Sequence, residues 1–223
     1  MHNSGHVIKG YRIDLESYFS KPALIWDLDG TLIDSYEAIG EALEVLYKNF
    51  AISFEKESTL DFVKRESVGK LLGKLSHQYN IPLPKLNQCF VKEQEKRDDQ
   101  ITLLPFAKEI LELTSLLGVR HFMYTHKGKT TEEVLRKFGI RSYFTEVLTS
   151  ISGFKRKPEP EAILYLIHKY KLNPENTYYV GDRKLDLEVA QKAHIGSFNL
   201  TQEDSPSNTF INDLLEIKNK LTF

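Results

Sequence analysis

Two aspartates, Asp27 and Asp29, directly follow an apolar run in the stretch ALIWDLDGTLIDS (residues 23–35). Carboxylates at the end of a buried strand are costly unless they reach solvent or a positive group. Because side chains alternate along a strand, Asp27 and Asp29 share one side while Leu28 turns toward the core. Gly30 then allows a sharp turn that brings backbone N–H groups close to a ligand.

Three further apolar runs also lead into polar side chains. If the runs are parallel strands of one sheet, their ends meet at one edge, which gathers four carboxylates, a hydroxyl and at least one lysine. Crowded carboxylates repel one another unless a cation lies among them, and Mg²⁺ is the natural candidate. Lysine and a hydroxyl suit a phosphate, and a free carboxylate that attacks phosphorus gives an aspartyl-phosphate route. The residues concerned are Thr125, His126, Lys157, Asp182 and Asp186.

The elements that must position these residues alternate between short apolar runs and amphipathic segments. Such alternation predicts an α/β protein with parallel strands and right-handed crossovers. Thr130 with Glu133 predicts a capping box, and Gly139 a helix end. The expected strands are 23–29, 121–126, 146–150, 177–182 and 196–200, with helices within 106–118, 130–139, 158–172 and 185–194.

The stretch 35–104 differs, because it has helical patterns and no convincing strand. Breaks are expected at Phe50–Glu57 and at NIPLP, where prolines oppose helix continuation. A helical insertion after the first strand would lie over the carboxyl ends of the strands, where open α/β sheets bind ligands. The predicted division is an N-terminal extension 1–20, a core of 21–34 and 105–223, and a helical cap 35–104.

Composition is that of an ordinary globular protein: 223 residues, 41% hydrophobic, 27% charged, and a formal net charge of −1. The near-zero charge gives no support for nucleic acid or an anionic membrane as the main partner, although a local basic patch is compatible with it. A single cysteine, Cys89, excludes an intramolecular disulfide and fits a reducing compartment. With no apolar run of ~18 residues and no signal-peptide pattern, the prediction is cytoplasmic.

These strand ends resemble, in order, the motifs of the haloacid dehalogenase superfamily of phosphohydrolases. DLDGTL is similar to DxDGT, GDRKLD to GDxxxD, and between them stand a strand-end Thr125 and Lys157 in KRKPEP. The insertion resembles the helical cap of the phosphoglycolate phosphatase and β-phosphoglucomutase branch. The resemblance implies a three-layer Rossmann-like core with a mainly parallel sheet, plus an inserted all-helical cap.

The resemblance also implies roles for the four aspartates. Asp27 would be the nucleophile and a magnesium ligand. Asp29 would protonate the leaving alcohol and then activate water, and its backbone carbonyl would bind the metal. Asp182 would ligate Mg²⁺, and Asp186 would support the metal through water.

The phosphate site implied by the resemblance comprises Gly30, Thr125, His126 and Lys157. Thr125 would hydrogen-bond the phosphoryl oxygens, and Lys157 would balance charge on nucleophile and phosphate; the neighbouring basic residues of KRKPEP, positions 155 and 156, remain alternatives. His126 stands where asparagine is common in the family. Its backbone N–H can bind phosphate, while its side chain could donate a hydrogen bond, add pH dependence, or be a neutral substitute.

The leading hypothesis is a magnesium-dependent phosphatase for a small phosphorylated metabolite, with specificity residues in the cap such as Lys64, Arg65 or Lys70. A phosphomutase of the β-phosphoglucomutase kind would share every core residue, and a catalytically inactive binding or regulatory protein is the non-enzyme alternative. A calcium loop is disfavoured by Thr31 and Leu32 at its fifth and sixth positions, and a dehalogenase would dispense with the acid/base aspartate. Monomer and dimer both stay open.

Overall fold

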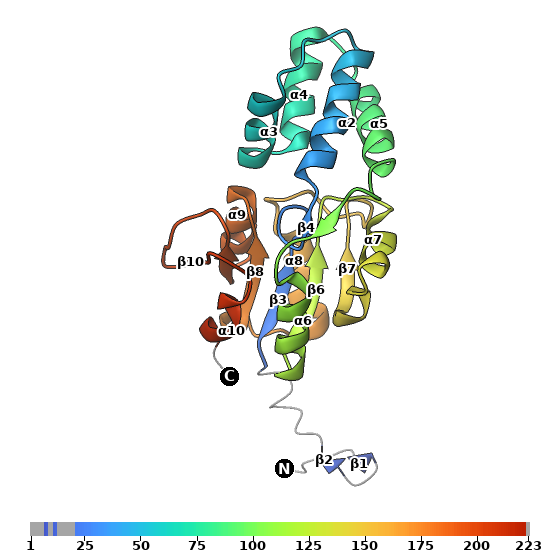
Figure 1. The fold of residues 1–223 in the computed structure, drawn as a ribbon. Helices are drawn as coiled ribbons and strands as arrows, with labels where there is room; N and C mark the ends of the chain where they lie inside the picture. Colours follow the sequence, from blue (N-terminus) through green and yellow to red (C-terminus); the bar gives the residue numbers. More distant parts are fainter. Residues whose placement is uncertain (1–6, 9–10, 13–20, 222–223) are drawn as a thin grey trace.

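The computed structural model describes residues 7–8, 11–12 and 21–221, and its centre is a six-stranded sheet (Figure 1). The strands are β3 (Ala23–Trp26), β6 (Arg120–Tyr124), β7 (Phe144–Leu148), β8 (Thr177–Gly181), β9 (Gly196–Asn199) and β10 (Asn208–Phe210). They lie in the order β10-β9-β8-β3-β6-β7, and each pairing is parallel. The predicted α/β class is confirmed, while β10 was not predicted.

Helices cover both faces of this sheet, because successive side chains of each buried strand point to opposite faces. On one face Leu24 and Trp26 of β3 share an apolar cluster with Ile110. On the other face Ile25 shares a cluster with Ile163. The first face carries α6 (Ala107–Leu116), α7 (Thr131–Lys137) and α10 (Glu216–Lys220); the second carries α8 (Glu161–Tyr170) and α9 (Lys184–Lys192).

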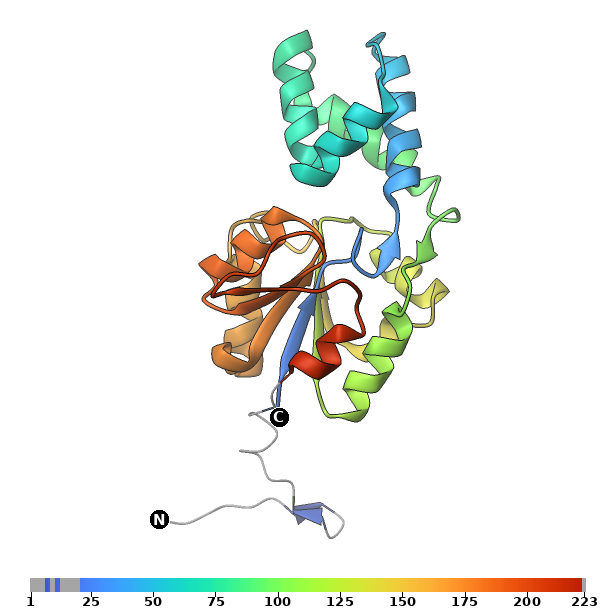
Figure 2. The same ribbon diagram turned by 60° about the vertical axis from the view of Figure 1, so that its left-hand side comes forward.

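The four helices between residues 36 and 95 form a separate bundle beyond the carboxyl ends of the strands (Figures 1 and 2). We call them the cap helices. They have their own apolar cluster, which includes Leu43, Leu72 and Leu86. The short strands β4 (Ile33–Asp34) and β5 (Thr102–Leu103) pair where the chain leaves and re-enters the core. The cap helices are α2 (Tyr36–Asn49), α3 (Lys56–Arg65), α4 (Val68–Tyr79) and α5 (Leu83–Glu95).

Two local expectations were wrong. Because breaks were expected only at Phe50–Glu57 and at NIPLP, the stretch between them was expected to form one helix. It contains α3 and α4 instead, because the Ser67 side chain accepts a hydrogen bond from Lys70 N and starts α4. The capping box at Thr130 is absent from α7. Thr130 has helical backbone angles, whereas a capping residue is usually extended, and it makes no side-chain cap. Gly139 ends the turn after α7 with φ +65°, as expected.

The predicted N-terminal extension 1–20 lies outside the described residues except for β1 (Val7–Ile8) and β2 (Tyr11–Arg12), which pair antiparallel.

Among the residues that the structure describes, no helix is both long and apolar enough to cross a membrane. The short 3₁₀ helices Arg141–Tyr143 and Pro174–Asn176 lead into β7 and β8.

Candidate active site

The central strand β3 is the point at which the strand order changes direction. Its neighbours are β6 on one side and β8 on the other, and each is reached by a separate crossover. Ligands of open α/β sheets bind in the crevice outside the carboxyl ends of strands at such a point. Asp27, Thr125 and Asp182 are the residues that directly follow β3, β6 and β8.

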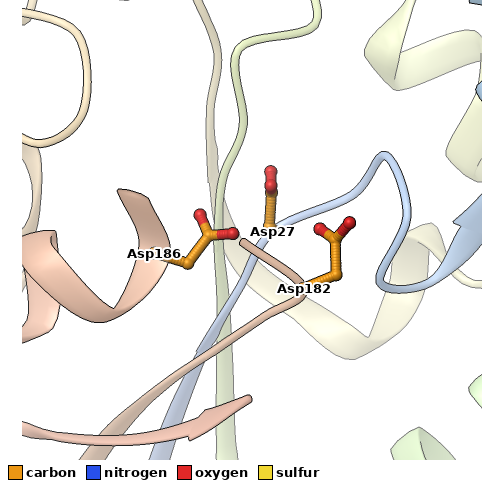
Figure 3. A group of neighbouring side chains, drawn as sticks. All are labelled: Asp27, Asp182 and Asp186. Carbon is orange, nitrogen blue, oxygen red and sulfur yellow. The ribbon is translucent and has the colours of Figure 1, made fainter. Parts of the chain in front are cut away.

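Three carboxylates converge at this edge (Figure 3). Asp27 follows β3, Asp182 follows β8, and Asp186 lies in the first turn of α9. All three are buried, and each offers an oxygen within 4.8 Å of the others. Burial, together with the carboxylate of Asp186, raises the pKa of Asp182 to about 7. Burial also raises the pKa of Asp186. For Asp182 and Asp186, the nearby positive charge is therefore too small to offset the effect of burial on the carboxylate.

The ammonium group of Lys157 lies between two of these carboxylates. Its Nζ is 3.0 Å from Asp27 Oδ2 and 2.7 Å from Asp186 Oδ1, and it donates a hydrogen bond of 3.0 Å to the hydroxyl of Tyr179. That hydroxyl donates in turn to the carbonyl oxygen of Tyr124 at 2.6 Å. Since an ammonium has three N–H donors, Lys157 faces one acceptor for each, and this fixes its position.

A second cation, the guanidinium of Arg183, also enters the cluster. Its Nη2 donates to Asp27 Oδ2 at 2.9 Å, and its Nε lies 3.9 Å from oxygens of both Asp182 and Asp186. Burial alone would raise the pKa of Asp27, but Lys157 and Arg183 outweigh burial and lower that pKa to about 2. Asp27 is therefore ionised at neutral pH.

The oxygens of this cluster fit a divalent cation such as Mg²⁺. Asp27 Oδ1 is buried and has no hydrogen-bond partner among the described residues, so this carboxylate can accept a further partner beside Lys157 and Arg183. Both oxygens of Asp186 accept hydrogen bonds from the ammonium of Lys157 and from Arg183 N, whereas those of Asp182 accept only from neutral hydroxyl groups. Carboxylate oxygens are the ligands that Mg²⁺ prefers. Asp27 and Asp182 would therefore hold the ion directly.

Asp182 is held by two side chains from the segment after β3. Thr31 Oγ1 donates to its Oδ1 at 3.3 Å, and the Tyr36 hydroxyl donates to its Oδ2 at 2.5 Å. Gly30 makes this approach possible, since it has φ +79° and a Cβ there would lie 2.3 Å from Asp182 Oδ2. The glycine is therefore required both by its backbone conformation and by the space that Asp182 occupies.

Thr125 is fully buried at the end of β6, where its Oγ1 accepts a hydrogen bond from Lys127 N at 3.1 Å. Next to it, His126 Nε2 accepts from Lys157 N at 2.9 Å, so the ring proton lies on Nδ1. Burial, helped by nearby Lys157 and Arg156, lowers the pKa of His126 to about 2. The histidine is therefore neutral at ordinary pH, and it orients the loop that carries Lys157.

Asp29 is half-buried, and its carboxylate is not a member of the buried group of three. Its Oδ1 is buried without a hydrogen-bond partner among the described residues. The neighbouring Leu28 is fully buried, so the expected alternation of side chains is present. The implied metal contact through the Asp29 carbonyl stays a prediction.

A cleft of ≈ 590 Å³ lies between the sheet edge and the cap helices. Of the cap lysines and arginine considered from the sequence, Lys64 and Arg65 line it. Lys70 instead pairs with Glu66 at 2.6 Å. Lys64 Nζ also lies 5.2 Å from the ring centroid of Tyr36. The lining residues are Gly30, Tyr36, Lys64, Arg65, Glu66, Asp182, Lys184, Leu200, Thr201 and Gln202.

Sequence reasoning missed three residues of this site: Tyr36, Tyr179 and Arg183. Tyr179 lies in an apolar strand, which predicts a core residue, and its ring is buried in the core, yet its hydroxyl contacts Lys157. Arg183 sits inside the GDRKLD motif, and its position beside Asp182 was the available signal. For Tyr36 the sequence held no signal, because its contact with Asp182 spans 146 residues.

Comparison with known proteins agrees with this geometry. A family model described as haloacid dehalogenase-like hydrolase matches residues 24–200. The chain is 32% identical over 192 residues to a phosphoglycolate phosphatase of Vibrio vulnificus, covering 80% of this chain and 82% of that protein. It is 25% identical over 173 residues to the pyrophosphatase PpaX of Oceanobacillus iheyensis, covering 77% of this chain and 79% of that protein.

Solved structures show the same fold. A haloacid dehalogenase-like family hydrolase of Streptococcus pneumoniae superposes with a TM-score of 0.75 at 19% identity, covering 90% of this chain and 98% of that one. A subfamily IA hydrolase of Geobacter sulfurreducens gives a TM-score of 0.69 at 21% identity, with 91% and 97% covered. By its sequence and by the arrangement of its strand ends, this chain belongs to the haloacid dehalogenase-like hydrolase family and lies among the phosphatases of that family.

Proposed function

We propose that the protein is a cytoplasmic, Mg²⁺-dependent phosphatase that hydrolyses a small phosphate monoester through an aspartyl-phosphate on Asp27. One observation carries this proposal: Asp27 is buried and ionised, two cations hold its Oδ2, and its Oδ1 has no partner among the described residues. A carboxylate with one anchored oxygen and one free oxygen is oriented for attack on an electrophile.

In the first step Asp27 Oδ1 attacks phosphorus, the bond from phosphorus to the leaving oxygen breaks, and Asp29 gives that oxygen a proton. In the second step Asp29 takes a proton from water, the water oxygen attacks phosphorus, and the acyl phosphate bond breaks to release inorganic phosphate and Asp27. The ammonium of Lys157 neutralises Asp27 and the phosphoryl oxygens. Mg²⁺, when bound by Asp27 and Asp182, supplies further positive charge for these oxygens.

The test is hydrolysis of a chromogenic aryl phosphate with and without Mg²⁺. We expect turnover that needs Mg²⁺ and is abolished in Asp27→Asn. Asp34→Asn is the matched control, because Asp34 is an exposed aspartate seven residues further along the same segment; it should retain activity. Turnover unaffected by Asp27→Asn would contradict the proposal. Conversion of β-glucose 1-phosphate into glucose 6-phosphate without phosphate release would favour a mutase.

The role of Asp29 has its own test, a series of leaving groups. Asp29→Asn should slow alkyl phosphates, whose leaving oxygen needs a proton, far more than aryl phosphates with acidic leaving groups. An equal loss across the series would show that Asp29 does not protonate the leaving group.

The substrate of this enzyme carries a second anionic group. This extension of the proposal is supported by the cleft, where Lys64 and Arg65 of α3 and Lys184 of α9 bring positive charge to the region around Asp182. The relatives named above agree, since phosphoglycolate has a carboxylate and pyrophosphate a second phosphate. The cleft volume of ≈ 590 Å³ suits a small metabolite.

Comparison of 2-phosphoglycolate with ethyl phosphate tests this extension, because ethyl phosphate has a methyl group in place of the carboxylate. The ratio of their kcat/KM values should exceed about tenfold in the wild type and shrink in Lys64→Gln and Arg65→Gln. Lys74→Gln is the control, since Lys74 of α4 lies over the ring of Phe62 and does not line the cleft. If all three variants give the wild-type ratio, the basic residues of the cap do not select the substrate.

A further inference from the structure

Arg183 is the one side chain whose cationic group lies within 4.0 Å of all three carboxylates of the described site. Its Nη2 is 2.9 Å from Asp27 Oδ2, and its Nε is 3.9 Å from Asp182 Oδ1 and from Asp186 Oδ2. Lys157, by comparison, contacts Asp27 and Asp186 only. The guanidinium therefore lies centrally among the oxygens that would hold a metal ion.

The hydrogen bonding of Arg183 is incomplete in this position. Arg183 is 8% exposed, yet its Nε is buried without a hydrogen-bond partner among the described residues. The distances of 3.9 Å to Asp182 and Asp186 are ion-pair distances and too long for hydrogen bonds. The guanidinium of Arg183 is thus held mainly by electrostatic attraction to the carboxylates. A second cation can supply the same attraction and take its place.

The formal charges of the site also indicate that Arg183 takes the place of a metal cation. Full ionisation of the three carboxylates would give a charge of −3, and Lys157 with Arg183 carries +2, so the protein itself supplies most of the neutralising charge. A divalent ion bound at Asp27 and Asp182 would lie close to the guanidinium in a buried site, where like charges repel strongly. Either the guanidinium moves away or the ion binds weakly.

We propose that Arg183 is an internal counter-ion that competes with the divalent cation for Asp27 and Asp182 and so weakens metal binding. This inference rests on the cation of the proposed function. Arg183 holds the carboxylates together before the metal binds, and it leaves Asp27 Oδ2 when the ion arrives. Metal affinity in this protein is therefore set by a residue that is not a ligand.

The experiment is a calorimetric titration of the full-length protein with Mn²⁺, which also takes oxygen ligands, in the absence of substrate. Arg183→Gln should bind Mn²⁺ at least about tenfold more tightly than the wild type, because a neighbouring positive charge is removed. Arg183→Lys, which keeps the charge, should stay within about threefold. Lys184→Gln is the matched control. It removes a charge from the next residue, whose exposed ammonium pairs with Glu188, and should change affinity less than about twofold.

Equal or weaker binding by Arg183→Gln would overturn the proposal, as would equal gains in Arg183→Gln and Lys184→Gln. If Arg183→Gln folds poorly, thermal unfolding replaces calorimetry: Mn²⁺ should raise the Tm of this variant more than that of the wild type, and failure to do so counts against the proposal. No Mn²⁺ binding by either protein would overturn this inference together with the metal of the proposed function. If the wild type hydrolyses substrate with Mg²⁺ but Arg183→Gln binds Mn²⁺ no more tightly than the wild type, only this inference is overturned.

Discussion

Replacing Tyr179 with phenylalanine removes one hydroxyl from the site and leaves the aromatic ring in place. The hydroxyl accepts a hydrogen bond from Lys157 Nζ at 3.0 Å and donates one to the carbonyl oxygen of Tyr124 at 2.6 Å. Tyr179 and the side chain of Lys157 are both 0% exposed, so bulk water does not reach the vacated positions. One N–H of a buried ammonium and one buried carbonyl would lose their partner.

A hydrogen bond to a charged group contributes about 1.5–3 kcal/mol, so we expect the free energy of unfolding to fall by about 2 kcal/mol. For a chain of this size that corresponds to a Tm lower by about 4–8 °C. Lys157 keeps its contacts with Asp27 and Asp186 and therefore stays in the site with more freedom. We expect kcat to fall about tenfold, which equals about 1.4 kcal/mol of transition-state stabilisation, with little change in KM.

The assay combines thermal unfolding with steady-state hydrolysis of the aryl phosphate. Tyr178→Phe is the control, because Tyr178 precedes Tyr179 on β8 and its ring stacks on Phe198, 4.8 Å away, on the opposite face of the sheet. That variant should change kcat less than about twofold. Equal effects of the two substitutions on kcat would refute the view that the Tyr179 hydroxyl positions Lys157.

Two further predictions concern a buried histidine of the core and a glycine of the cleft. Burial lowers the pKa of His121 to about 3, so between pH 6.5 and 3 the unfolded chain takes up a proton that the folded protein does not, and stability falls as the pH falls. Urea unfolding at pH 7 and pH 5 should show about 2 kcal/mol more loss in the wild type than in His121→Gln, and equal losses would contradict this assignment. Gly30→Ala should abolish most phosphatase activity and lower Tm, because its Cβ would lie 2.3 Å from Asp182 Oδ2. Gly73→Ala in α4, where a Cβ meets nothing within 4 Å, should be neutral or stabilising in the same assays; equal behaviour of the two glycine variants would be evidence against the steric argument.

The positions of the carboxylates were predictable from sequence because they depend on backbone rules. Parallel strands end at one edge, so Asp27 and Asp182 had to approach one another once β3 and β8 were recognised as strands. The helices α2 to α5 followed from the helical patterns between residues 35 and 104, although the short strand β5 at Thr102–Leu103 was not expected there. Helix boundaries inside the cap were harder to predict from sequence, because the break before α4 depends on the hydrogen bond that the Ser67 side chain accepts from Lys70 N.

The contacts that complete the site were not predictable in this way. Tyr36, Tyr179 and Arg183 act through long side chains whose direction depends on packing between segments distant in sequence. A tyrosine in an apolar strand is predicted to be a core residue, and for the ring of Tyr179 this prediction is correct. Its polar tip contacts the site only because Lys157, from the loop after β7, enters the same buried space.

The two internal cations act unequally on the carboxylates, and this inequality separates their roles. Asp27 contacts both Lys157 and Arg183, and its pKa falls to about 2. Asp182 has only the distant Nε of Arg183, with hydrogen bonds from two hydroxyls, and its pKa rises to about 7. Titratable groups whose pKa values are driven apart by their surroundings mark different chemical roles. Asp27 has the charge that a nucleophile needs without any metal, whereas Asp182 becomes fully ionised at neutral pH only when further positive charge arrives. The divalent cation of the proposed function would therefore act mainly on Asp182, whose carboxylate also accepts a hydrogen bond from the hydroxyl of the cap residue Tyr36.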